Sequence, residues 1–131
     1  MAGFATYEDI TAWQRARKLV TGIYKVTSRS PFGQDYGLKD QIRRATVSIC
    51  SNIAEGYERR GNKEFVKFLW IAKGSAAEVS SQLYHAKDLG YVSEAEFSNL
   101  YTEAKEIGAM LFGLIKAIVS SPEKGLSFVR L

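Results

Sequence analysis

QIRRATVSICSNIAEGYER, residues 41–59, decides the fold, because its apolar spacing is that of one long helix with two unlike faces. At about 100° per residue, side chains that recur every three or four positions share one side of a helix, and such a stripe packs on a core. A second apolar set falls on the other side and is expected to contact a neighbouring subunit. The core stripe consists of Leu38, Ile42, Ala45, Ile49, Ile53 and Gly56. The second set consists of Val47, Cys50 and Ala54.

The remainder of the chain divides into helices in the same way. Thr6 and Asn62 are the expected N-caps of the first and third helices, Gly90 ends the third, and Ser93 with Glu96 forms the capping box of the fourth. The predicted helices cover about residues 7–30, 38–60, 63–89 and 94–120, with an irregular tail at 122–131. Since the helices are similar in length and the joints are short, we predict a single all-α domain over residues 1–131, an antiparallel up-down-up-down four-helix bundle.

The inventory of reactive side chains excludes several kinds of site. One cysteine and one histidine cannot form an internal disulfide framework or a Cys/His zinc site. A di-iron centre in a bundle needs a Glu-x-x-His pair on each of two helices, so it is excluded as well. His85 is expected on a solvated face, Cys50 is expected to be a packed thiol, and no phosphate-binding loop is present. We therefore expect no catalytic residues, no metal and no cofactor, and a protein that is not an enzyme.

The apolar segments are too short to cross a membrane. The longest, residues 107–119, is 13 residues long and contains Lys116, whereas a membrane-spanning helix needs roughly 18 or more apolar residues. The first nine residues lack the basic cluster and apolar core of a signal peptide. The sequence therefore predicts a cytoplasmic protein without membrane contact.

Positive charge is concentrated in the first half of the chain. Residues 1–74 hold 13 Lys and Arg against 7 Asp and Glu, although the net charge of the whole chain is only +4. Basic surfaces of this kind contact phosphate backbones. An ordinary solvated face is the alternative, since no aromatic side chains interleave with the charges of the first helix. The candidate nucleic-acid-binding residues are Arg15, Lys18, Lys25 and Arg29 on the first helix, with Arg43, Arg44 and Arg59 on the second.

A polar ridge follows the second helix beside its core stripe. Asn52 lies at the core edge and must find hydrogen-bond partners, because an unsatisfied buried amide costs about 1–3 kcal/mol. We interpret the ridge as a polar seam within or between subunits, and a ligand or nucleic-acid site is the alternative. The ridge consists of Gln41, Arg44, Ser48, Asn52, Glu55 and Arg59.

The third helix carries two apolar stripes and therefore predicts two packing partners. The core stripe consists of Phe65, Phe68, Leu69, Ala72, Ala76, Val79, Leu83 and Ala86. The second stripe consists of Val66, Trp70, Ala77 and Tyr84, about 100–140° away. An isolated bundle would expose these side chains, and large exposed apolar patches are typical of interfaces. We expect a homo-oligomer, and the alternative is that this stripe covers loops or the tail.

The residues also resemble a known family. QIRRA at 41–45, NIAEG at 52–56, FVKFL at 65–69 and AKGSAAE at 72–78 are similar to the four-helix-bundle family named after proteins encoded in intervening sequences of bacterial 23S rRNA genes. The resemblance covers nearly the whole chain and includes the regions YEDITAW at 7–13 and LGY at 89–91. It implies a homopentameric ring. It also implies kinship with the accessory variability proteins of diversity-generating retroelements, basic pentamers that bind nucleic acid and a reverse transcriptase. Many family members carry proline where this chain has Cys50, so the second helix is expected to be less kinked here.

Two functional hypotheses follow. The first is a non-enzymatic, oligomeric protein that binds RNA or structured DNA through backbone phosphates. The alternative is a protein-interaction scaffold whose basic faces dock an acidic or polymerase-like partner protein.

Overall fold

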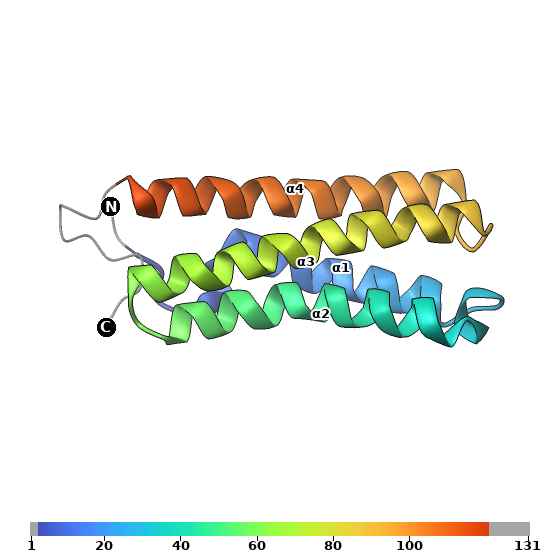
Figure 1. Ribbon diagram of the computed structural model, residues 1–131, viewed down its shortest axis with the longest axis horizontal. Coiled ribbons are helices and arrows are strands. Elements are labelled where there is room, and N and C mark those ends of the chain that lie inside the picture. Colours follow the sequence, from blue (N-terminus) through green and yellow to red (C-terminus); the bar gives the residue numbers. More distant parts are fainter. Residues whose placement is uncertain (1–2, 121–131) are drawn as a thin grey trace.

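The computed structural model describes residues 3–120 and contains four long helices. The helices are α1 (Thr11–Thr27), α2 (Tyr36–Glu58), α3 (Asn62–Asp88) and α4 (Glu94–Val119), and the short 3-10 turns η1 (Tyr7–Asp9) and η2 (Phe32–Gln34) precede α1 and α2. Successive helices run in opposite directions along the long axis of the molecule (Figure 1). Each helix packs on its neighbours in sequence, and α1 also packs on α4. This is the predicted all-α, up-and-down arrangement, in which α1 lies diagonally from α3 and α2 from α4.

The predicted glycine turn after α3 and the predicted start of α4 are confirmed, although α3 ends at Asp88 rather than residue 89 and α4 ends at Val119 rather than residue 120. Gly90 adopts a positive φ of 75°, and Tyr91 N–H donates to the Ala86 carbonyl at 2.8 Å, so the chain leaves α3 through a left-handed turn that favours glycine. The capping box is also present: Ser93 N–H donates to the Glu96 carboxylate at 2.8 Å, and Glu96 N–H donates to Ser93 Oγ at 3.1 Å. Both ends use local hydrogen bonds, which is why the sequence could predict them.

The predicted boundaries of the other helices need correction. The first helix does not begin at Tyr7, because residues 7–9 form the separate turn η1 and the extended Ile10 interrupts the helical backbone. It ends at Thr27 rather than Ser30. The second helix begins two residues early, at Tyr36, because the Asp35 carboxylate accepts a hydrogen bond from Leu38 N–H at 3.1 Å, and it ends at Glu58 rather than residue 60.

The N-cap prediction for α3 was wrong by one residue. Asn62 is the first residue of the helix, and the extended Gly61 precedes it as N-cap. Thr6 caps η1 instead of α1, because its backbone N–H donates a hydrogen bond to the Asp9 carboxylate at 3.1 Å.

The buried residues of α2 and α3 agree with the core stripes that were predicted for these two helices. All eight predicted core residues of α3 are buried, and those of α2 are buried except Leu38, which is partly exposed. Gly56 marks a close approach of α2 and α3, because a Cβ added there would lie 2.5 Å from Phe68 Cβ. Fully burying a large apolar side chain stabilises a fold by about 1.5–3 kcal/mol, so these stripes hold the helices together. None of the helices within residues 3–120 is both long and apolar enough to span a membrane.

Candidate nucleic-acid interface

A shallow surface groove runs between α1 and α2. It has two halves of about 600 Å³ and 630 Å³, and both halves are lined by Tyr24 and Val47. The first half is also lined by Asp40, Arg43, Arg44, Ser48 and Ser51. The second is also lined by Val20, Thr21, Lys25 and Ser28. The groove therefore combines three cationic side chains with five hydroxyl groups and one carboxylate.

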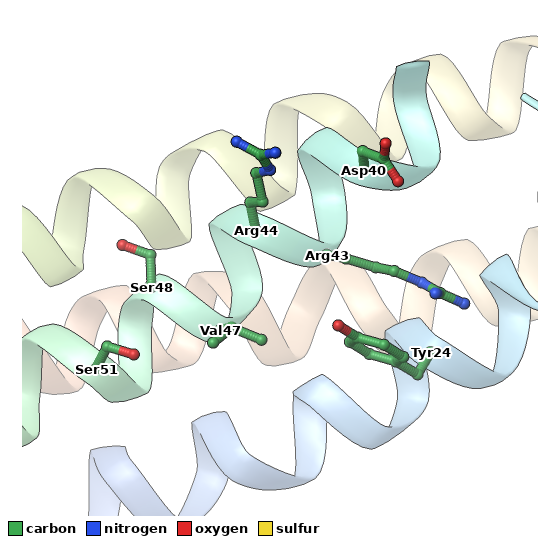
Figure 2. A pocket seen from close by; sticks show the side chains of 7 residues that line it. All are labelled: Tyr24, Asp40, Arg43, Arg44, Val47, Ser48 and Ser51. Carbon is green, nitrogen blue, oxygen red and sulfur yellow. The ribbon is translucent and has the colours of Figure 1, made fainter. Parts of the chain in front are cut away.

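Arg43 is the most firmly held of these cations. Its Nε donates to Thr27 Oγ1 at 2.8 Å and its terminal Nη2 donates to Ser28 Oγ at 3.1 Å. The guanidinium carbon lies 4.1 Å from the centre of the Tyr24 ring, and Figure 2 shows Arg43 extending from α2 alongside that ring. All three partners are uncharged, so the guanidinium is oriented without an ion pair to any carboxylate within residues 3–120.

Arg44 and Lys25 supply the other two positive charges. Arg44 lines both this groove and a smaller pocket over α2 and α3, and in Figure 2 it projects from the same edge of α2 as Ser48. Neither Arg44 nor Lys25 takes part in an ion pair within residues 3–120. Both charges are therefore available to an anionic ligand.

The remaining predicted basic residues on α1 lie beside carboxylates of α4. Arg15 binds Glu103, at 2.5 and 2.9 Å, and also Glu106. Its hydrogen bonds raise the pKa of Arg15 and lower the pKa of Glu103, whose pKa is lowered further by the nearby charge of Lys18. Arg15 is therefore engaged by α4 and does not line the groove.

Arg29 and Arg59 are also paired. Arg29 donates to both Glu96 oxygens, at 2.5 and 2.6 Å, and together with the Ser93 N–H it lowers the pKa of Glu96 to about 2. Arg59 lies 2.8 Å from Glu55 and 3.7 Å from Glu64. The structure thus brings together only three of the seven predicted phosphate-contacting residues, namely Lys25, Arg43 and Arg44.

The polar ridge of α2 lies against α3 of the same chain. Asn52 donates to the Ser48 carbonyl at 2.8 Å and to Ser48 Oγ at 2.9 Å, so it finds the partners that its position requires. Ser48 Oγ in turn lies 2.9 Å from Ser75 Oγ, and Gln82 Nε2 donates to Gln41 Oε1 at 3.5 Å. Gln41, Ser48 and Asn52 of the polar ridge therefore make hydrogen bonds within their own chain.

The second apolar set of α2 is divided between two environments. Val47 is exposed and lines the groove, whereas Ala54 and Cys50 are half-buried. Cys50 packs on the core of its own chain, with Sγ 4.0 Å from the Trp13 carbonyl oxygen. Burial raises the pKa of the Cys50 thiol to about 11, so the thiol is protonated at neutral pH.

The second stripe of α3 joins aromatic residues of α4 in one exposed face, which we term the aromatic face. Trp70 and Phe112 are 48% and 42% exposed, and their ring centres are 6.0 Å apart. The Lys73 ammonium lies 6.0 Å from the Trp70 ring and 5.8 Å from the Phe112 ring. Its exposed residues are Trp70, Ala77, Tyr84, Lys105, Ala109, Phe112 and Lys116, and its half-buried residues are Val66, Lys73, Tyr101 and Gly108.

Several of these residues were not predicted as parts of a site. Neither Tyr24 nor Ser51 was among the predicted site residues. The expectation that no aromatic side chain interleaves with the charges of the first helix was wrong, because the Tyr24 ring lies 4.1 Å from the Arg43 guanidinium and lines the groove with Lys25. Phe112 lies in the apolar segment 107–119, which was considered only as a possible membrane span. Pairing of Tyr24 with Arg43, or of Trp70 with Phe112, depends on how two helices are rotated against each other, which periodicity within one helix does not reveal.

Within residues 3–120, no three His, Cys, Asp or Glu side chains lie close enough together to hold a metal ion. His85 is exposed, as predicted.

Comparison with known proteins gives a family and a fold. The model of the 23S rRNA-intervening sequence protein family matches residues 8–113. The chain is also similar to a crystal structure of a protein of unknown function from the S23 ribosomal protein family of Bacteroides thetaiotaomicron VPI-5482. That similarity has a TM-score of 0.73 and 20% sequence identity, and it covers 81% of this chain and 96% of the other. Comparison with curated proteins gives no match.

Proposed function

The chain belongs to the 23S rRNA-intervening sequence protein family, and from this premise we propose that it is a non-enzymatic, oligomeric protein that binds nucleic acid through the groove between α1 and α2. One observation carries the proposal: Lys25, Arg43 and Arg44 line this groove and form no ion pair within residues 3–120, and Asp40 is the single carboxylate in the lining. Arginine and hydroxyl groups are the donors that proteins commonly use to bind backbone phosphates.

The shape of the groove favours an extended ligand. It is shallow and open, and its cations are distributed over both halves rather than gathered around one enclosed cavity. A small acidic metabolite would stay largely solvated in such a site, whereas small-molecule sites bury most of their ligand. A polyanion can use all three cations at once, because successive phosphates repeat along its backbone.

The aromatic face supports self-association. Tryptophan, tyrosine and phenylalanine are enriched in protein interfaces, and exposed apolar patches of this kind are typical of them. The trough between α3 and α4 is lined by small residues, by Phe112 and by Lys73 and Lys105, with no carboxylate in its lining. Pairing this face with the same face of a second copy would bring like charges together. We therefore propose a head-to-tail contact with a different face of the next copy, which can close into a ring, such as a pentamer.

The nucleic-acid proposal is tested by fluorescence anisotropy with fragments of ribosomal RNA. We expect binding at about 50 mM salt that weakens steeply as salt rises. The double variant Lys25→Ala/Arg44→Ala should bind more weakly. Its plot of log binding constant against log salt concentration should be less steep by about 1.4, the value for two lost phosphate contacts to a single strand. Lys63→Ala/Lys67→Ala removes the same charge from α3 and is the matched control. Absence of binding, or equal losses in both double variants, would refute a specific role for the groove.

A protein-interaction scaffold is the second candidate function. The lysine-rimmed apolar trough of the aromatic face favours it, because an acidic, polymerase-like partner could place apolar residues in the trough and carboxylates on Lys73 and Lys105. A pull-down that retains one protein after nuclease treatment, and loses it in Trp70→Ala, would favour the scaffold over nucleic-acid binding.

A further inference from the structure

We propose that the groove selects single-stranded nucleic acid, because Tyr24 offers a stacking surface for one unpaired base. This inference rests on the proposed function and assigns a ligand class to the same site. Tyr24 is 40% exposed and is the aromatic side chain that lines both halves of the groove. Aromatic side chains beside cationic ones are the combination by which proteins bind single strands without sequence preference.

The Tyr24 ring is held in place before any ligand arrives. Arg43 lies 4.1 Å from the ring centre, and its guanidinium is fixed by Thr27 and Ser28 at the end of α1. Thr27 Oγ1 also donates to the Ile23 carbonyl at 2.7 Å, so its own position is fixed by the helix. A prearranged Tyr–Arg stack loses little side-chain freedom when a base packs on it.

Phosphate contacts are available on both sides of this stack. Arg44 and Ser51 line the half of the groove on one side of Tyr24, and Lys25 lines the other half. A base on Tyr24 would therefore have its flanking phosphates near cations in both directions along the strand. Val47, which is exposed between the two halves, adds an apolar contact for the base.

A duplex cannot use this arrangement. The faces of its bases are covered by their neighbours in the stack, and only base edges reach the grooves. A shallow site on a rigid pair of helices has no means of extruding a base from the duplex. Duplex binding would therefore use the three cations Lys25, Arg43 and Arg44, and the face of the Tyr24 ring would contribute nothing to it.

The test compares one RNA sequence as a single strand and as a duplex, and the same sequence as single-stranded DNA. Anisotropy is measured at about 50 mM salt with wild type, Tyr24→Ala, Tyr24→Phe and Tyr24→Leu. Tyr36→Ala is the matched control, because Tyr36 is 66% exposed on α2, with the Lys39 ammonium 4.8 Å from its ring, and does not line the groove. Loss of one stacking contact should weaken both single strands at least about 5-fold in the Ala and Leu variants.

Duplex affinity, and the affinity of the Tyr24→Phe variant for single strands, should change little. Duplex binding should stay within about 2-fold of wild type in every Tyr24 variant, and Tyr24→Phe should keep single-strand affinity because it keeps the ring. Tyr24→Leu keeps the bulk of the side chain, so it separates stacking from packing if the Ala variant is less stable. Equal losses for RNA and DNA single strands show that the base rather than the sugar is bound, and a loss confined to RNA would overturn the stacking assignment.

Failure of this inference differs from failure of the proposed function. If Lys25→Ala/Arg44→Ala weakens binding while the Ala and Leu variants of Tyr24 leave single-strand affinity unchanged, stacking is refuted and the groove remains a phosphate site. If the Tyr24 variants weaken duplex as much as single strands, strand selection is refuted. If the groove double variant also binds like wild type, both proposals fall.

Discussion

The contact between α2 and α3 at Gly56 permits a sharp test of the packing. A Cβ at this position would lie 2.5 Å from Phe68 Cβ and 3.3 Å from Phe68 Cγ. Phe68 Cβ is attached directly to the α3 backbone, so no side-chain rotation removes the clash and the two helices must move apart. Overpacking of this kind costs about 1–3 kcal/mol, and a backbone-fixed contact belongs at the upper end.

Helix propensity acts in the opposite direction and must be subtracted. Replacing glycine by alanine within a helix gains about 1 kcal/mol. Gly56→Ala should therefore lower the free energy of unfolding by about 2 kcal/mol. Gly113→Ala is the matched control, because it lies inside α4 and an added Cβ would meet nothing within 4 Å. It should raise the free energy of unfolding by as much as 1 kcal/mol, about the propensity gain alone.

Urea unfolding followed by circular dichroism measures both variants against wild type. The two alanines should shift the midpoint in opposite directions with unchanged denaturant slopes. If Gly56→Ala were as stable as Gly113→Ala, the close approach of α2 and α3 would not exist as described, and the helix spacing on which the groove geometry depends would be wrong.

Three further predictions concern other parts of the molecule. Arg29 and Ser93 lower the pKa of Glu96 from its ordinary 4.5 to about 2, so the stabilisation by these contacts is present above about pH 4.5 and is lost as pH falls towards 2. Between these pH values, the free energy of unfolding should therefore depend less on pH in Glu96→Gln than in wild type. Because the pKa of the Cys50 thiol is raised to about 11, iodoacetamide at pH 8 should modify the folded protein far more slowly than the urea-unfolded chain, and equal rates would contradict the packed position. Trp70→Ala/Phe112→Ala should lower the mass measured by light scattering to that of one 14.6 kDa chain, while Tyr36→Ala should leave the assembly intact; a wild-type mass of 14.6 kDa would refute self-association.

The sequence predicted the core faces well because each is a property of a single helix. The repeat that places Ile42, Ile49 and Ile53 on one line does so whatever the neighbouring helices do. The capping box at Ser93 and the glycine turn at Gly90 are likewise local. These features were therefore available before any tertiary contact was known.

The predicted basic surface depended on contacts that no local pattern contains. Arg15 is neutralised by Glu103 and Glu106, which lie 88 and 91 residues away. Periodicity placed Arg15 and Lys25 on the same side of α1. It could not show that α4 packs close to Arg15, whereas Lys25 lines the groove beside α2. The start of α1 failed for a related reason: residues 7–9 satisfy their hydrogen bonds in a separate turn that resembles a helix in sequence.

The topology explains why the groove keeps its charge. The carboxylates Glu96, Glu103 and Glu106 lie on α4, which packs on α1 and α3 but is diagonal to α2. Arg15 on α1 and Arg29 just after its end can reach these carboxylates, and both are paired. Arg43 and Arg44 are on α2 and cannot reach them, and the flank of α1 that faces α2 offers hydroxyls instead. Asp40 is the one carboxylate in the groove lining, and it forms no ion pair of 4.0 Å or less within residues 3–120. Three cations against one carboxylate leave the groove with a net positive charge, and the proposed binding of a phosphate backbone depends on that charge.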